Sequence, residues 1–140
     1  MVRRLRTIAA MTRLEQCVER LCKLVAHQTV NPGGDELGLC NQLAALLREL
    51  GADEVTVTTV DRTADTDGAY VYARLGTPTL LLNVHLDTVP ANSGWQRDPF
   101  VAEVTDGRVY GLGSCDIKGA IAAILTALEG GTAKNLSMLF

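Results

Sequence analysis

The chain has 140 residues, of which 47% are hydrophobic and 21% are charged, and its formal net charge is −3 at pH 7. This length and composition are typical of one globular domain with a single core. The mild acidity gives no electrostatic reason to expect nucleic acid or an anionic membrane as a partner.

The first eleven residues are basic, and the first acidic residue of the chain is Glu15. Their apolar part is about four residues long, which is shorter than the roughly 7 to 15 apolar residues of a secretory signal. We therefore expect residues 1–11 to form a disordered extension and residues 12–140 to form the folded part of the chain.

Two helices are expected next. Thr12 and Glu15 have the spacing of a capping box, and apolar residues follow at helical spacing, which predicts a helix from residue 12 that ends before Asn31. A second helix is expected over residues 35–50, with Gly51 as its left-handed C-terminal residue. His27 has no carboxylate or cysteine at ligand spacing, so we interpret it as a surface or helix-capping residue.

Strand signals dominate the following stretch of the chain. β-Branched residues predict strands over residues 54–60 and 70–75, and the continuous apolar run 79–85 predicts a strand that is buried on both faces. An Asp-Gly pair centres a hairpin over residues 100–110. A helix after Lys118 and a last strand over residues 135–140 complete an α/β fold, for which we expect a central mixed, mostly parallel sheet with helices on both faces.

The four cysteines form no C-x-x-C pair, and two of them lie on the apolar faces of the expected helices. This pattern favours reduced thiols over disulfides, and reduced thiols predict a cytoplasmic location.

Two short motifs carry residues that could perform chemistry. In residues 83–90, His85 and Asp87 are two positions apart on an extended segment, so their side chains face the same way. Asp87 could accept the N–H of one imidazole nitrogen and leave the other nitrogen for a metal ion. In residues 110–120, glycines surround Asp116 just ahead of a helix, and this carboxylate stands where a dinucleotide loop would have its third glycine.

Together with Gly94-Trp95 and Asp98-Pro99-Phe100, these motifs resemble the acetylornithine deacetylase, succinyl-diaminopimelate desuccinylase and aminoacylase family of co-catalytic zinc metallopeptidases. The sequence is most similar in character to an acetylornithine deacetylase. The resemblance implies that His85 binds one metal, that Asp87 is the catalytic residue supporting it, and that Asp116 bridges two zinc or cobalt ions. It also implies a cis peptide bond between Asp116 and Ile117.

The function implied by this resemblance is hydrolysis of an amide bond in an N-acylated amino acid. N-acetylornithine, in arginine biosynthesis, is the first expectation. Succinyl-diaminopimelate desuccinylase and carboxypeptidase or dipeptidase activities of the same family are the alternatives. The implied partner is a small N-acyl amino acid, and members of the family are often homodimers.

The resemblance runs from about Thr12 onward but covers only the amino-terminal part of the family's length, so we expect an incomplete catalytic domain. The general-base glutamate, the remaining metal ligands and a lid or dimerisation domain of the family have no counterpart here. With two ligands, the chain alone should bind metal weakly and be inactive. It could also be a non-catalytic remnant, or a subunit completed by another chain. An incomplete sheet should expose apolar residues such as Leu136, Met138 and Leu139 and promote self-association.

Overall fold

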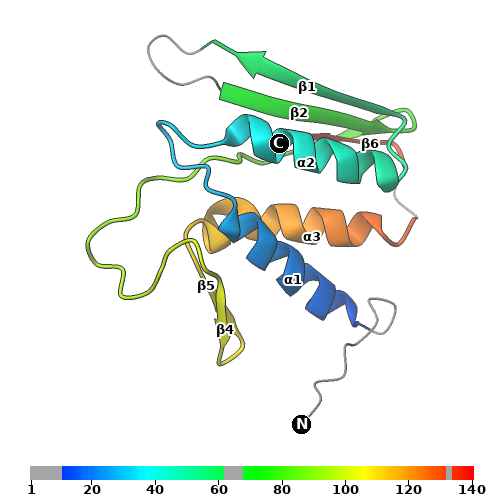
Figure 1. Ribbon diagram of the computed structural model, residues 1–140. Helices are drawn as coiled ribbons and strands as arrows, with labels where there is room; N and C mark the ends of the chain where they lie inside the picture. Colours follow the sequence, from blue (N-terminus) through cyan, green and yellow to red (C-terminus); the bar gives the residue numbers. More distant parts are fainter. Residues whose placement is uncertain (1–10, 62–67, 132–133) are drawn as a thin grey trace.

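The structure is a computed structural model that describes residues 11–61, 68–131 and 134–140. The expected extension at residues 1–11 lies outside this range except for Met11, and its prediction stays untested. The helices and strands that follow keep the labels of Figure 1, where helices lie beneath a sheet seen close to edge-on.

Both amino-terminal helices begin at the caps that the sequence indicates. Helix α1 (Arg13–Ala26) follows Thr12, whose hydroxyl accepts from the Glu15 amide at 3.2 Å while the Glu15 carboxylate accepts from the Thr12 amide at 2.8 Å. This reciprocal pair is a complete capping box. Helix α2 (Glu36–Glu49) is capped by Asp35, and Gly51 after its end has φ of 87°, the left-handed conformation that glycine adopts easily.

The described strands form one four-stranded sheet and one two-stranded hairpin. The sheet contains β1 (Glu54–Val60), β2 (Gly68–Leu75), β3 (Leu80–Asn83) and β6 (Leu136–Leu139), in the spatial order β1-β2-β6-β3. The pairs β1–β2 and β2–β6 are antiparallel and β6–β3 is parallel. The expected mixed sheet in an α/β fold is therefore confirmed, although its parallel pairing is limited to β3 and β6.

The hairpin consists of β4 (Glu103–Thr105) and β5 (Arg108–Tyr110), joined by Asp106 and Gly107 with φ of 50° and 73°. Positive φ at both central residues is the geometry that an Asp-Gly turn favours. A short irregular helical segment, η2 (Ser114–Lys118), then leads into α3 (Gly119–Leu128). The sequence predicted both the hairpin and this helix.

All the described helices lie on one side of the sheet (Figure 1), so the described residues show helices on one face only. The side chains that α1, α2 and α3 contribute there join one core with buried residues of β2 and β6, of which Val71, Ala73 and Met138 are fully buried. Because side chains alternate along a strand, the neighbours of these residues point to the opposite face, where Tyr70 and Leu81 are exposed.

Two expectations about the strands are wrong. Leu80 and Leu81 are 58% and 53% exposed, so β3 is not buried on both faces. Conversely, Met138 is fully buried, and Leu136 and Leu139 are only partly exposed. The reason is the strand order, since β6 lies between β2 and β3 and the last strand along the chain is not an edge strand.

Helices α1 and α3 are joined by a polar contact as well as by packing. The Arg20 guanidinium forms an ion pair with Glu129 and donates a 3.4 Å hydrogen bond to the Thr126 hydroxyl. Elsewhere, all four cysteines lie in described residues and carry free thiols, as expected. Within the described ranges, no helix combines the length and apolarity needed to cross a membrane.

Candidate metal centre

His85 and Asp87 lie on the extended segment that continues from β3. Val84 and Leu86 of this segment point into the core and are nearly fully buried, whereas His85 is exposed. The alternation that buries the two apolar residues therefore turns the two polar side chains to the opposite side. The first motif is in this way anchored by its apolar neighbours.

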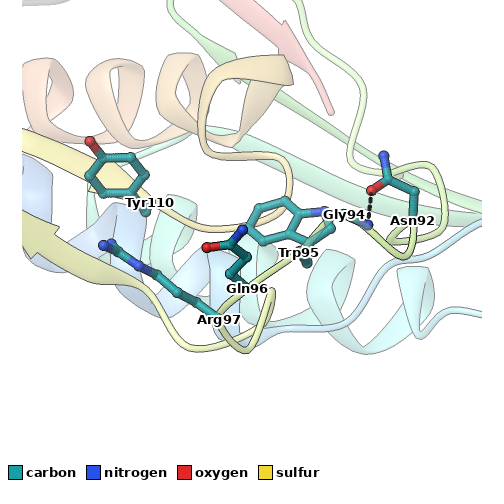
Figure 2. Close-up of a pocket in the computed structure, with 6 residues that line it drawn as sticks. All are labelled: Asn92, Gly94, Trp95, Gln96, Arg97 and Tyr110. Carbon is teal, nitrogen blue, oxygen red and sulfur yellow. Dashed lines mark hydrogen bonds between the residues drawn. The ribbon is translucent and has the colours of Figure 1, made fainter.

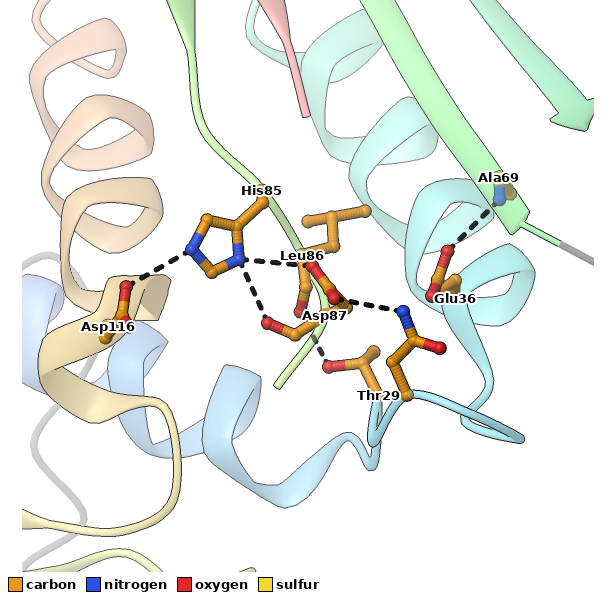
Figure 3. A network of polar contacts seen from close by, with 8 residues as sticks. Thr29, Glu36, Ala69, His85, Leu86, Asp87 and Asp116 are labelled. Atoms are coloured by element: carbon orange, nitrogen blue, oxygen red, sulfur yellow. Dashed lines mark hydrogen bonds and ion pairs between the residues drawn. The ribbon is translucent and has the colours of Figure 1, made fainter. Parts of the chain in front are cut away.

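Asp116 is carried by segment η2, directly ahead of α3. The chain enters this segment through Gly113, whose φ of 75° is left-handed, and the peptide bond between Asp116 and Ile117 is cis, as the family resemblance implies. The Asp116 side chain is 87% exposed and reaches toward His85 from the side of α3 (Figure 3).

The His85 imidazole lies between the two aspartates. Its Nδ1 atom is 3.0 Å from the Asp87 carbonyl oxygen and 3.2 Å from the Asp87 Oδ1 atom, while its Nε2 atom is 3.2 Å from Asp116 Oδ1. Both atoms that face Nδ1 are hydrogen-bond acceptors, so the ring donates from Nδ1. The structure thus brings together the three residues that the two motifs singled out.

The electrostatics of the ring follow from these neighbours. Partial desolvation by itself would lower the pKa of His85. The hydrogen bonds to the Asp87 carbonyl and to the Asp116 carboxylate, together with the two negative charges, outweigh it, so the pKa is raised above its ordinary value of 6.5. Without another cation, the site attracts a proton.

These side chains open into a cavity of about 280 Å³ that is lined by residues of both motifs. Thr88, which also lines it, has a buried hydroxyl oxygen that finds no hydrogen-bond partner among the described residues. A buried hydroxyl without a partner costs free energy, so Thr88 is a destabilising feature beside the cavity.

The residues present fit part of a metal site. Zinc binds imidazole nitrogen and carboxylate oxygen at about 2.0 to 2.2 Å, and two such ligands at a tetrahedral angle would lie roughly 3.3 Å apart. The 3.2 Å between His85 Nε2 and Asp116 Oδ1 matches that separation. In residues 11–61, 68–131 and 134–140, no group of three or more His, Cys, Asp or Glu side chains is arranged to hold a metal ion. The fit is to two ligands of a larger set.

Sequence reasoning missed one residue of this site, Asn31. Its side-chain amide donates a 3.2 Å hydrogen bond to Asp87 Oδ2, so both carboxylate oxygens of Asp87 are held. No local pattern points to Asn31, because it lies 56 residues from Asp87 in a turn that reads only as a helix stop.

His27 is the C-cap residue of α1, where its amide donates to the Leu24 carbonyl at 3.3 Å, so the expected helix-capping role is confirmed and the surface alternative is wrong. The imidazole is only 13% exposed, and its Nε2 atom lies 3.2 Å from the Asp35 carboxylate and 2.9 Å from the Asp35 carbonyl oxygen. Its ring therefore braces the turn between α1 and α2.

A second pocket is lined by residues that lie mostly between the two motifs in the sequence. It has a volume of about 370 Å³ and is lined by six residues between Asn92 and Tyr110 (Figure 2). The Arg97 guanidinium stacks over the Tyr110 ring at 4.7 Å from its centroid and forms a 3.1 Å ion pair with Glu103. The cation of this pocket is thus already neutralised, and none of its lining residues is a common zinc ligand.

Residues 81–139 match the family model described as peptidase family M20/M25/M40. N-acetyl-L-citrulline deacetylase of Xanthomonas campestris pv. campestris is 43% identical over 122 residues, which cover 84% of this chain and 31% of that protein. Succinyl-diaminopimelate desuccinylase of Stenotrophomonas maltophilia is 38% identical over 112 residues, covering 77% and 28%. The chain thus spans less than a third of the length of these curated relatives.

Solved structures share the fold. Human carnosine dipeptidase 1 matches with a TM-score of 0.71 at 24% identity, over 88% of this chain and 31% of that one. An M20 family metallo-carboxypeptidase from Sulfolobus solfataricus matches with a TM-score of 0.70 at 24% identity, over 89% and 29%. The segment that matches peptidase family M20/M25/M40 contains His85, Asp87 and Asp116, and the curated relatives are similar to this chain over the same motifs.

Proposed function

We propose that this chain contributes part of the metal site of an enzyme that hydrolyses the amide bond of an N-acylated amino acid. The observation that carries the proposal is the pairing of His85 Nε2 with Asp116 Oδ1 at 3.2 Å, at the edge of an open cavity. A nitrogen lone pair and a carboxylate oxygen at this distance need a cation between them, either a proton or a metal ion.

In this proposal His85 and Asp116 hold metal, with two zinc or cobalt ions in the complete site and Asp116 shared between them. When bound, such ions polarise the scissile carbonyl and lower the pKa of bound water. Asp87 keeps the Nδ1 proton of His85 in place, so that Nε2 offers its lone pair to the ion. A general base is expected from outside the described residues, because Asp87 and Asp116 are already committed to these tasks.

For the substrate we propose N-acetylornithine first, as the character of the two motifs suggests, which would place the enzyme in arginine biosynthesis. The names of the curated relatives support two competitors, N-acetyl-L-citrulline at 43% identity and succinyl-diaminopimelate at 38% identity. All three are small N-acyl amino acids with a polar end. The four free thiols support a reducing compartment, and we propose the cytoplasm. Homodimerisation is proposed from the family resemblance.

A second candidate is favoured by the small number of metal ligands, since in the part of the chain that the structure describes no third His, Cys, Asp or Glu side chain joins His85 and Asp116 in a metal site. In this alternative the chain is a non-catalytic product, or it becomes active only with a complementing polypeptide. Metal binding by His85 and Asp116 is compatible with both candidates, so turnover distinguishes them.

The proposal is tested by titrating the purified, metal-free chain with Zn²⁺ and Co²⁺ in a calorimeter. We expect weak binding that Asp116→Ala reduces by more than tenfold and that His27→Ala reduces less than Asp116→Ala does. Equal affinities in the two variants would remove the proposed site. Assays with the three N-acyl amino acids should show no hydrolysis by the chain alone, and turnover that survives chelation and metal reloading would show that the base lies within residues 1–140.

A further inference from the structure

The segment 27–31, which connects α1 to the turn before α2, contacts both motifs of the candidate metal centre. Its backbone runs parallel to the first motif through a bridge between Val30 and Thr88. The Thr88 amide donates to the Thr29 carbonyl at 2.9 Å, and the Asn31 amide donates to the Thr88 carbonyl at 2.9 Å. The fully buried Thr29 hydroxyl donates to the Leu86 carbonyl at 2.7 Å.

The side chain of Asn31 connects this paired backbone to the side chains of Asp87 and His85. It donates from Nδ2 to Asp87 Oδ2, while the other oxygen of that carboxylate faces His85 Nδ1. Because the backbone hydrogen bonds fix where Asn31 sits, its amide sets the plane of the Asp87 carboxylate. That plane in turn decides how well Asp87 holds a proton on Nδ1 of His85, against Asp116, which faces Nε2.

The second motif reaches the same segment through Lys118, two residues after Asp116. Lys118 is only 2% exposed, and its Nζ atom donates to the His27 carbonyl at 2.7 Å. Its own amide donates to the Gly113 carbonyl at 2.9 Å, which closes the turn that carries Asp116. A buried ammonium that binds a carbonyl is costly to break, so this contact ties η2 to the end of α1.

We propose that segment 27–31 positions the two metal-binding motifs relative to each other, with Asn31 and Lys118 as positioning residues. Asn31 orients Asp87 and through it His85, while Lys118 anchors the turn of Asp116 to the same backbone. This inference rests on the proposed function, because the expected effect of the positioning is a higher affinity for metal. The orientation of His85 itself is measurable without any metal.

The first test uses Asn31→Ala, which removes the amide but leaves the backbone hydrogen bonds to Thr88 possible. The tautomer is read in metal-free Asp116→Ala protein, where no carboxylate competes for a proton on Nε2. Nitrogen NMR of His85 at a pH where the ring is neutral should show the Nδ1-protonated tautomer there and a mixture when Asn31→Ala is added. Zinc affinity should fall by roughly tenfold to a hundredfold, the range for partners that orient a metal ligand. Asn41→Ala, an exposed asparagine on α2, is the matched control and should change neither quantity.

The second test uses Lys118→Met, which keeps the apolar stem and removes the ammonium, with Lys134→Met as an exposed control. Zinc affinity should again fall at least tenfold while the His85 tautomer stays that of the wild type, because Lys118 acts on the other motif. If Lys118→Met fails to fold, Asn31→Ala decides the proposal alone.

The outcomes separate the two claims. A wild-type chain that binds no zinc overturns the proposed function, and the tautomer comparison still decides the role of Asn31. A wild type that binds zinc, with Asn31→Ala matching its affinity and leaving the tautomer of the Asp116→Ala protein unchanged, overturns the positioning role and leaves the proposed function standing.

Discussion

His85 is the residue whose chemistry changes most with its surroundings. Its raised pKa means that the folded protein binds a proton there more tightly than the unfolded chain does. In the absence of metal, the stabilisation is therefore fully present below the ordinary pKa of 6.5 and is lost as the pH rises through the higher folded value. A bound metal ion requires the opposite state, the neutral ring.

We therefore expect zinc affinity to rise with pH through the range just above 6.5 and to level off once His85 is neutral. Calorimetric titrations across this range, with the pKa of His85 followed by NMR, would measure both quantities. His27 serves as the internal reference for the NMR signal. An affinity that does not change while His85 titrates would show that His85 is not a ligand.

At the level of elements, much of the fold follows from local sequence. The capping box at Thr12, the left-handed Gly51 and the Asp-Gly hairpin turn are short-range patterns, and the structure contains all three. Strand β1 matches its expected bounds, because a run of β-branched residues fits the pleated, half-buried surface of a strand.

The remaining features depend on which strands become neighbours, and local patterns do not encode this. The apolar run at Leu80 and Leu81 indicated a central strand, yet β3 is an edge strand of the described sheet. Met138 was expected to be exposed on an incomplete sheet, yet it is fully buried. The contact of Asn31 with Asp87 likewise arises only when two segments far apart in the sequence pair in register.

The turn that carries Asp116 gives a test at the same scale. A Cβ atom on Gly113 would lie 2.6 Å from Thr88 Cγ2, in addition to the positive φ of this residue. Gly113→Ala should therefore lower the free energy of unfolding by roughly 2 to 5 kcal/mol, the sum of a left-handed backbone term and an overpacking term.

Gly107→Ala is the matched control, because Gly107 has nearly the same φ and a Cβ there would meet nothing within 4 Å. It should cost only the backbone term of about 1 to 2 kcal/mol. Urea unfolding of both variants measures the difference. Equal losses would mean that Thr88 moves aside freely, and that the two motifs are less tightly packed than the structure shows.

For the whole molecule, the sheet has helices on one face only among the described residues (Figure 1), and no described strand pairs with the outer edge of β3. An exposed apolar edge strand pairs readily with another copy. We expect the chain to self-associate at micromolar concentration through β3. The sequence alone had suggested self-association through the residues of β6.

Leu81→Lys places a charge on this edge and should shift the chain toward monomer in sedimentation velocity experiments. Val101→Lys adds the same charge at an exposed loop position and should leave the association unchanged. A wild type that sediments as a monomer and melts cooperatively would contradict the argument from the open sheet.

The central place of β6 also dictates an order of assembly. Strands β1 and β2 adjoin along the chain, whereas β3 pairs in the described sheet only with β6, whose residues are synthesised after those of the other three strands. Closing the long loop between Leu75 and Leu136 costs entropy before any of its contacts can form. During synthesis the β1–β2 hairpin can therefore gain protection early, and β3 must wait. The backbone of Val71 bonds Phe140, which directly follows β6, so the next pair along, Thr58 and Tyr70, is the one that bonds across β1 and β2. Pulse-labelled hydrogen exchange should find the Thr58 amide protected before the Val84 amide, which donates to Leu139 and so forms its bond only when β6 inserts between two waiting strands.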